Sequence, residues 1–325
     1  MSMDMRANTP AAPGQQAQAA PSVAILMCTY QGESYMAEQL DSFAAQSHAD
    51  WALWVSDDGS RDATLSILEQ YRQRWGAGRL HVVAGPGKGV TANFLSLTCL
   101  AEIRGDYYAF ADQDDVWLAQ KLQRALDALQ AVPEGVPALY CARTCLVDAD
   151  NREIGRSPLF AKPPSFANAL MQNLGGGNTM VFNQAARALL QEAGADVDVP
   201  VHDWWTYLVV SACGGRVFYD AEPALRYRQH GANLIGMNAG VGARLRRMLL
   251  LWRGGYRAWG ERHVRALERL RARMSPDSLA VFNTFLQARN SSLVPRVAGF
   301  WRAGIYRQTF AGNLGLVFAA LFGKL

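Results

Sequence analysis

Two aspartates in the run Asp112-Gln113-Asp114-Asp115 have the residue type and spacing of a metal–diphosphate site. The run follows the apolar stretch 107–111, which predicts a buried strand, and open α/β sheets bind ligands at the carboxyl ends of their strands. Carboxylates this close repel each other unless a proton or a cation intervenes, and Mg²⁺ is typically shared between carboxylates and substrate phosphates. The alternative is that Asp114 or Asp115 caps a helix that begins near Trp117.

Two other predicted strands, 22–29 and 51–56, also end in polar loops. The first loop is Thr29–Glu33, and the second begins with Asp57-Asp58-Gly59-Ser60. Asp, Gly and Ser are turn formers, so the second loop is alternatively a simple βα turn. If the sheet is parallel, the loops after all three strands meet at one edge and form a single site.

Six motifs carry a family resemblance: Val23–Gly32, Ser56–Thr64, Asp112–Trp117, Gly175–Met180, His202–Trp205 and Tyr227–Gly231. In this order and spacing they resemble glycosyltransferase family 2, whose members have the GT-A fold. The last three motifs are similar to the rhamnosyltransferase-like branch, which builds bacterial surface polysaccharides. The resemblance covers residues 22–236, and its specificity lies in the combination, because each motif alone is a weak signal.

The expected fold class is α/β, because strand-like runs alternate with helical patterns and such alternation calls for a parallel sheet. The resemblance implies a GT-A, Rossmann-like, mostly parallel sheet flanked by helices, with a C-terminal helical extension. We expect a disordered tail over 1–21, a catalytic domain over 22–236 and a basic amphipathic helical region over 237–325. Expected strands include 22–29, 51–56, 79–84, 107–111, 138–147, 178–182, 217–219 and 225–227, and expected helices include 34–47, 62–74, 89–103, 117–131, 166–173, 183–193 and 203–213.

By resemblance, the nucleotide sugar is bound by Thr29, Tyr30, Glu33, Asp57, Asp58, Lys88, Asn93, Asp112, Gln113 and Arg228. Tyr30 would stack on the base or is an ordinary aromatic residue at the rim of the site. Asp57 or Asp58 would accept a hydrogen bond from the base or the ribose. Lys88 precedes a predicted helix whose N-terminus favours an anion, and the alternative for this segment is a flexible turn.

The resemblance also implies a divalent metal cofactor, Mn²⁺ or Mg²⁺. It assigns direct metal ligation to Asp114, a ribose or metal contact to Asp112, and a further metal or diphosphate contact to His230.

By resemblance, Asp203 is the expected general base, which deprotonates the acceptor hydroxyl in inverting members of the family. The alternative is that Asp203 only caps the helix that it opens. The family usually has an acidic residue where this chain has His202. The pocket for the acceptor or the donor sugar would be lined by Gly176, Gly177, Asn178, His202, Trp204 and Trp205. The two tryptophans are alternatively core residues.

The predicted activity is that of an inverting, metal-dependent glycosyltransferase in bacterial surface polysaccharide synthesis. Its donor is a nucleotide-diphosphate sugar such as dTDP-rhamnose, and its acceptor is a saccharide or a lipid-linked saccharide. One alternative is a non-catalytic nucleotide-sugar or glycan-binding protein of the same fold. Another is a nucleotidyltransferase, which would usually have a basic, Gly-rich loop where this chain has Thr29-Tyr30-Gln31-Gly32-Glu33.

Charge is divided unevenly along the chain: residues 240–325 contain 15 Lys and Arg against 3 Asp and Glu, whereas residues 1–239 contain 17 against 25. Such a basic region predicts a polyanionic partner, and its accompanying aromatic residues favour an anionic membrane surface over nucleic acid. The apolar run Leu314–Phe322 is shorter than the ~20 residues that span a bilayer. We therefore expect a cytoplasmic protein, peripheral on the inner face of the plasma membrane. A helical cap or a homodimer interface is the alternative.

Overall fold

The computed structural model describes residues 20–76, 78–229 and 255–325. Most of the predicted N-terminal tail, the metal candidate His230 and the arginine-rich stretch 244–253 therefore lie outside the described residues. The predicted domain boundary near 236 also falls in the part that is not described.

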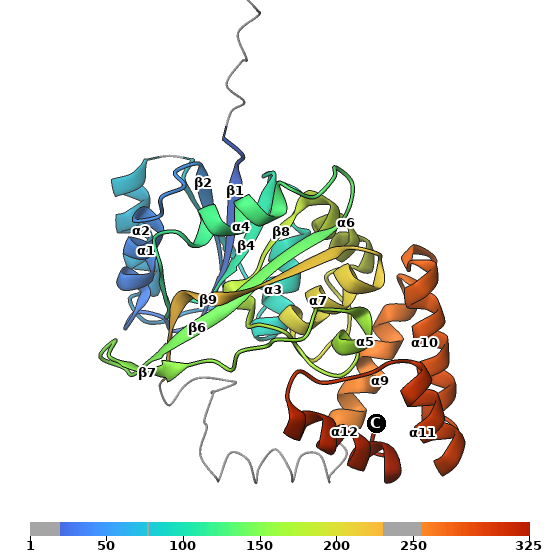
Figure 1. Ribbon diagram of the computed structural model, residues 1–325. Coiled ribbons are helices and arrows are strands. Elements are labelled where there is room, and N and C mark those ends of the chain that lie inside the picture. Colours follow the sequence, from blue (N-terminus) through green and yellow to red (C-terminus); the bar gives the residue numbers. More distant parts are fainter. Residues whose placement is uncertain (1–19, 77, 230–254) are drawn as a thin grey trace, which may run out of the picture.

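The described residues form one nine-stranded sheet in the order β3-β2-β1-β4-β8-β6-β9-β5, with β7 paired to β6 (Figure 1). The strands are β1 (Val23–Thr29), β2 (Trp51–Asp57), β3 (Leu80–Ala84), β4 (Tyr107–Ala111), β5 (Val116–Trp117), β6 (Ala138–Val147), β7 (Glu153–Arg156), β8 (Val181–Asn183) and β9 (Arg216–Arg228). The expected parallel arrangement holds for β3, β2, β1 and β4. Beyond β4 the sheet is mixed, because β8 runs antiparallel to both β4 and β6 while β9 runs parallel to β6.

Helices cover both faces of this sheet (Figure 1). One apolar core lies beneath α1 (Met36–Ala44), α2 (Thr64–Trp75) and α4 (Lys121–Leu129). The other lies beneath α3 (Val90–Cys99), α5 (Phe166–Ala169), α6 (Gln184–Ala193) and α7 (His202–Ala212). The result is a three-layer α/β/α arrangement.

Strand β1 belongs to both cores, because successive side chains of a strand point to opposite faces. Val23, Ile25 and Met27 pack beneath α1, α2 and α4, while its alternate residues pack beneath α3 and α7. A strand buried on both faces must be apolar throughout, and for that reason the sequence shows it so clearly.

Residues 255–325 contain four further α-helices: α9 (Gly255–Glu268), α10 (Pro276–Arg289), α11 (Leu293–Arg302) and α12 (Phe310–Leu321). Leu267 at the end of α9, Leu270 just after it, and Phe282 of α10 are completely buried in the same core as α7. These two helices therefore cap the catalytic body. None of the described helices is both long and apolar enough to cross a bilayer.

For several helices and strands, the bounds or the type predicted from local sequence patterns differ from those in the structure. The helix expected from residue 117 begins at Lys121, because Val116 and Trp117 instead pair with β9 as the short strand β5. The strand expected over 178–182 begins as a 3-10 turn, η1 (Gly177–Thr179), and only then continues as β8. Strands 217–219 and 225–227 are one strand, β9, and β7 was not expected. For β5, pairing with the distant strand β9 overrides local propensity.

We expect Phe282→Ala to destabilise the protein by about 3–5 kcal/mol, because it would leave a cavity in the shared core. Trp301→Ala is the control, since this α11 residue is 84% exposed and should shift stability by less than about 0.5 kcal/mol. Urea unfolding monitored by circular dichroism measures both. Equal, small effects would mean that α10 is not part of the cooperative unit.

Candidate active site

The loops after β1 and β4 are joined by hydrogen bonds at the carboxyl ends of the strands. The Gln113 side chain accepts a hydrogen bond from Tyr30 N at 2.9 Å and donates one to Tyr30 O at 3.0 Å. Gln39 of α1 donates to Asp112 O at 2.8 Å. A Cβ atom at Gly32 would lie 2.6 Å from Gln113 Oε1, so only glycine fits beside this contact. The acidic loop is therefore held in place before any ligand arrives.

Arg228 supports the same loop from β9. Its buried guanidinium donates to Asp114 O at 3.1 Å, to Ala149 O at 2.6 Å and to Glu38 Oε2 at 2.7 Å. It also lies over the Tyr35 ring, 4.4 Å from the centroid. The guanidinium is only 1% exposed, so in this geometry it supports the loop backbone rather than presenting its charge to a phosphate.

The acidic loop concentrates negative charge. Burial, with the charges of Asp114 and Asp203, raises the pKa of Asp112 to about 7, and Lys121 acts in the opposite direction. This carboxyl therefore holds a proton more readily than an ordinary aspartate does. A bound cation would displace this proton and offset the repulsion between the neighbouring carboxylates.

Asp115 belongs to a buried network below the loop. Its Oδ2 accepts a hydrogen bond from Asn178 Nδ2 at 2.6 Å, and Lys121 Nζ donates to Asn178 O at 2.6 Å. Lys121 Nζ also lies 3.1 Å from the Trp117 ring centroid. Burial raises the pKa of Asp115 well above its usual value and lowers that of Lys121 well below. The network ties the acidic loop to η1, and Lys121 is a residue that sequence reasoning missed.

The alternative that Asp114 or Asp115 caps the following helix is wrong. Helix α4 begins at Lys121 and its N-cap is Gln120, whose side chain makes no capping hydrogen bond. Pairing of β5 with β9 separates the aspartates from this helix.

Asp203 lies in the first turn of α7 and faces η1. Its Oδ2 accepts a hydrogen bond from Gly177 N at 3.1 Å, and its Oδ1 accepts one from Trp204 N at 2.6 Å. Burial raises the pKa of the carboxyl to about 6, although these backbone hydrogen bonds act to lower it. The helix N-cap is Val201, so Asp203 is not the capping residue.

His202 packs beneath this turn. Its ring stacks on Phe94, with centroids 3.9 Å apart, and meets Phe110 edge-on. Burial lowers its pKa to about 3, so the ring is neutral. A Cβ atom on Gly177 would lie 2.5 Å from His202 Nε2. His202 therefore shapes the turn by packing.

Among the other predicted pocket residues, both tryptophans are in the core. Trp205 is completely buried, and Trp204 donates its ring N–H to Ala169 O at 2.6 Å. The structure thus favours their packing alternative over contact with a sugar ring. Gly176 and Gly177 present backbone beside Asp203, while the Asn178 side chain is committed to Asp115.

The carboxylates after β2 brace neighbouring loops. Asp57 accepts hydrogen bonds from Thr29 Oγ1 at 2.8 Å, from Gly59 N at 3.1 Å, and from Ser60 N and Oγ at 2.8 and 2.6 Å. Asp58 accepts from Gly87 N at 2.6 Å and Gly89 N at 3.0 Å. The two aspartates therefore connect β1, β2 and the loop before α3.

The remaining nucleotide candidates differ in access. Tyr30 and Lys88 are exposed at the loop surfaces, whereas Asn93 is buried. The Asn93 side chain accepts a hydrogen bond from Ser56 Oγ and donates one to Ser56 O. Glu33 accepts a hydrogen bond from Ala63 N at 2.8 Å and so joins the loops after β1 and β2. Within the described part of the chain, no three His, Cys, Asp or Glu side chains are grouped closely enough to hold a metal ion by themselves.

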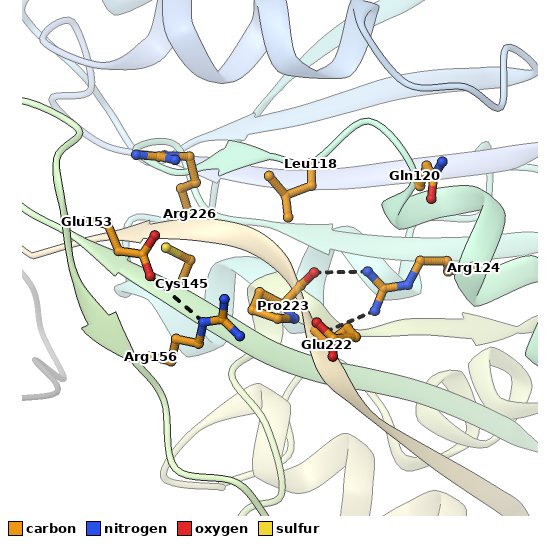
Figure 2. A pocket seen from close by; sticks show the side chains of 9 residues that line it. All are labelled: Leu118, Gln120, Arg124, Cys145, Glu153, Arg156, Glu222, Pro223 and Arg226. Carbon is orange, nitrogen blue, oxygen red and sulfur yellow. Dashed lines mark hydrogen bonds and ion pairs between the residues drawn. The ribbon is translucent and has the colours of Figure 1, made fainter.

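A separate hollow of about 460 Å³ lies among β6, β7, β9, α4 and the residues just before α4 (Figure 2). Its charged lining residues are already committed: Arg124 donates to Glu222 O and Pro223 O, and Arg156 pairs with Glu153. We assign no role to this hollow.

Comparison with known proteins gives consistent matches. The family model for Glycosyl transferase family 2 matches residues 24–193. The dTDP-rhamnosyl transferase RfbG of Shigella flexneri is 28% identical over 245 residues, which cover 71% of this chain and 81% of the relative. The putative teichuronic acid biosynthesis glycosyltransferase TuaG of Bacillus subtilis is 34% identical over 110 residues, 33% of this chain and 41% of the relative.

Solved structures confirm the expected GT-A fold. TarS 1–349 of S. aureus in complex with UDP-GlcNAc has a TM-score of 0.51 at 16% identity, covering 93% of this chain and 88% of that chain. GalNAc-T7 with UDP, GalNAc and Mn²⁺ has a TM-score of 0.52 at 10% identity, covering 89% and 55%.

We expect Lys121→Met to lower the free energy of unfolding by about 1–3 kcal/mol, because it leaves the buried Asn178 O without its donor and removes the amine nearest to Asp115 in the network. Lys88→Met, at an exposed site, is the matched control and should change stability by less than about 0.5 kcal/mol. Chemical denaturation of both variants checks this. A Lys121→Met protein as stable as the control would show that Asp115 is held neutral without Lys121.

Proposed function

The chain belongs to glycosyltransferase family 2, and we propose that it is an inverting, metal-dependent enzyme that transfers rhamnose from a nucleotide-diphosphate donor. The observation that carries this proposal is the closeness of Asp203 to the acidic loop. Gly177 N donates a hydrogen bond to Asp203 Oδ2, and the side chain of the next residue, Asn178, donates one to Asp115 Oδ2, so η1 joins Asp203 to the acidic loop. A base candidate thus lies beside the expected diphosphate site, as a direct displacement requires.

In the proposed reaction, Asp203 accepts the proton of the acceptor hydroxyl as its oxygen attacks the anomeric carbon of the donor sugar. The new bond joins that carbon to the acceptor oxygen, and the bond to the diphosphate oxygen breaks. The nucleoside diphosphate leaves with the bonding electron pair, and the anomeric configuration inverts. A carboxyl with a pKa of about 6 is ionised at neutral pH and still basic enough to share the proton.

The residues present fit a divalent cation, Mn²⁺ or Mg²⁺. Asp112 and Asp114 would hold it, and the diphosphate would complete the ligand set, as is common where Mg²⁺ binds through one or two carboxylates and substrate phosphates. When bound, the cation neutralises the charge that develops on the leaving diphosphate. His230 remains a predicted further contact outside the described residues. The Mn²⁺ in the GalNAc-T7 structure supports this assignment by analogy of fold.

We propose dTDP-rhamnose as the donor because the alignment with the Shigella flexneri dTDP-rhamnosyl transferase covers most of both chains. Tyr30 would contact the base from the rim, where its ring is 58% exposed. Either Asp58 or Asp57 would accept a hydrogen bond from the nucleotide and would lose one of the hydrogen bonds that it accepts from the neighbouring loops. Lys88 would meet the anionic side of the donor.

The proposed acceptor is a saccharide carried on a lipid, in the synthesis of a surface polysaccharide such as an O-antigen. The teichuronic acid relative supports this class of product. A lipid-linked acceptor requires work at a membrane, so we propose peripheral attachment to the inner face of the plasma membrane.

We expect Asp114→Asn to weaken metal-dependent binding of dTDP-rhamnose at least about tenfold, because it removes a charged ligand of the cation. Asp127→Asn changes an exposed aspartate of α4 and serves as the control. Calorimetric titrations with dTDP-rhamnose, UDP-GlcNAc and GDP-mannose, each with and without Mn²⁺ or Mg²⁺, measure donor choice and metal dependence together. Undiminished turnover of Asp114→Asn in excess EDTA would contradict the metal assignment.

We expect kcat/KM of the wild type to fall about tenfold for each pH unit below about 6, because protonated Asp203 cannot accept the acceptor's proton. Asp203→Asn should lower turnover by about two to four orders of magnitude and abolish this dependence. Donor affinity should remain near that of the wild type. If donor affinity falls together with turnover, Asp203 belongs to the donor site or to the fold.

A further inference from the structure

Helix α12 and its C-cap residue Phe322 present most of their large apolar side chains to solvent, while Leu316 packs against the protein. Six of them are between 44% and 81% exposed: Phe310, Leu314, Val317, Phe318, Leu321 and Phe322. Their spacing of three or four residues places them along one face of the helix. An ordinary surface helix turns such a face toward the core, so the orientation of α12 is reversed.

Small residues form the inward face of α12. Ala319 and Ala320 are its buried residues, while Gly312 and Gly315 are partly buried. Small side chains allow the helix to approach the rest of the protein, and they leave the large side chains facing away from it.

Helix α11 adds to the same apolar region. Leu293, Val294, Val297 and Trp301 are exposed, with Trp301 reaching 84%. Ten of the eighteen exposed large hydrophobic residues in the described chain thus fall within residues 293–322. Both helices lie at the end of the molecule away from α1 and α2 (Figure 1). An apolar concentration of this kind marks an interaction surface.

The charge of this region decides between possible occupants. Residues 278–325 contain no Asp or Glu, and their basic residues are Arg289, Arg296, Arg302, Arg307 and Lys324. A symmetric dimer would place this surface against its own copy, so cations would face cations. The chain segment 240–254 carries four arginines and no acid, and it would be repelled in the same way. An anionic lipid surface complements both the charge and the apolar side chains.

We propose that α11 and α12 form a docking surface for a bilayer that contains anionic phospholipid. The twelve residues of α12 give a length of about 18 Å, against a hydrocarbon core of about 30 Å. The helix therefore lies in the interface, with its aromatic rings at headgroup depth and the exposed Arg302 of α11 at the lipid phosphates. The inference rests on the proposed function only in that a lipid-linked acceptor gives membrane docking a purpose.

Hydrogen bonds connect the docking surface to the catalytic body. In the segment between α11 and α12, Gln308 N donates to Gln172 Oε1 at 2.9 Å and Tyr306 O accepts from Asn168 Nδ2 at 3.0 Å. Asn168 Oδ1 in turn accepts from Tyr207 of α7, the helix that begins next to Asp203. Docking would thus hold the base in a defined position relative to the membrane.

The test is flotation of the full chain with vesicles of phosphatidylcholine and phosphatidylglycerol, without donor or acceptor. The triple variant Trp301→Ser, Phe310→Ser, Leu314→Ser should bind at least about tenfold more weakly than the wild type, because it removes apolar groups that enter the interface. The control Leu65→Ser, Ile154→Ser, Leu159→Ser changes three residues of 46–58% exposure elsewhere and should bind as the wild type does. Pure phosphatidylcholine vesicles and high salt should both weaken binding.

Unfolding curves of the two triple variants establish that both are folded. The proposal would be overturned if the α11–α12 triple variant floated with vesicles as well as the wild type does. It would also be overturned if the wild type bound no vesicles but formed a dimer that the triple variant converts to a monomer. Donor titrations on the same proteins separate this inference from the proposed function. A chain that binds vesicles but no nucleotide sugar would contradict the proposed function and leave the docking surface supported.

Discussion

Mutual repulsion of carboxylates at the carboxyl ends of the strands is the constraint on which the site depends. Burial and the nearby charges of Asp114 and Asp203 raise the pKa of Asp112. The surrounding protein restrains this charge instead of removing it. Arg228 and Gln39 hold backbone carbonyls of the loop, and Lys121 lies beneath it. The loop is thus fixed in a geometry that a divalent cation and a diphosphate would relieve.

The same constraint explains why glycine is required around the site. Gly32 leaves room for Gln113, and Gly177 leaves room for His202 while its N–H reaches Asp203. A side chain at either position would displace a residue that holds a carboxylate. Backbone and buried side chains therefore set the positions of the acidic groups, as precise placement of reacting groups requires.

The C-terminal helices divide their apolar residues between two purposes. Phe282 and Leu267 complete the core beneath α7, so α9 and α10 stabilise the catalytic body. Helix α12 buries mainly small side chains, and both α11 and α12 expose large ones. One basic region of the sequence thus contains both the predicted cap and the surface proposed for membrane docking.

The sequence by itself determined the first half of the fold and the location of the acidic site. Strands β1, β2 and β4 are buried and end in polar loops, so their apolar runs and the aspartates that follow were readable without coordinates. Only the tertiary structure decided that Arg228 pairs with Glu38, that Lys121 is buried below Trp117, and that Trp205 belongs to the core. These outcomes depend on contacts between residues far apart in the chain, which no local pattern encodes. The periodicity of α12 likewise predicts an apolar face, but only packing against the rest of the protein determines whether that face points inward or outward.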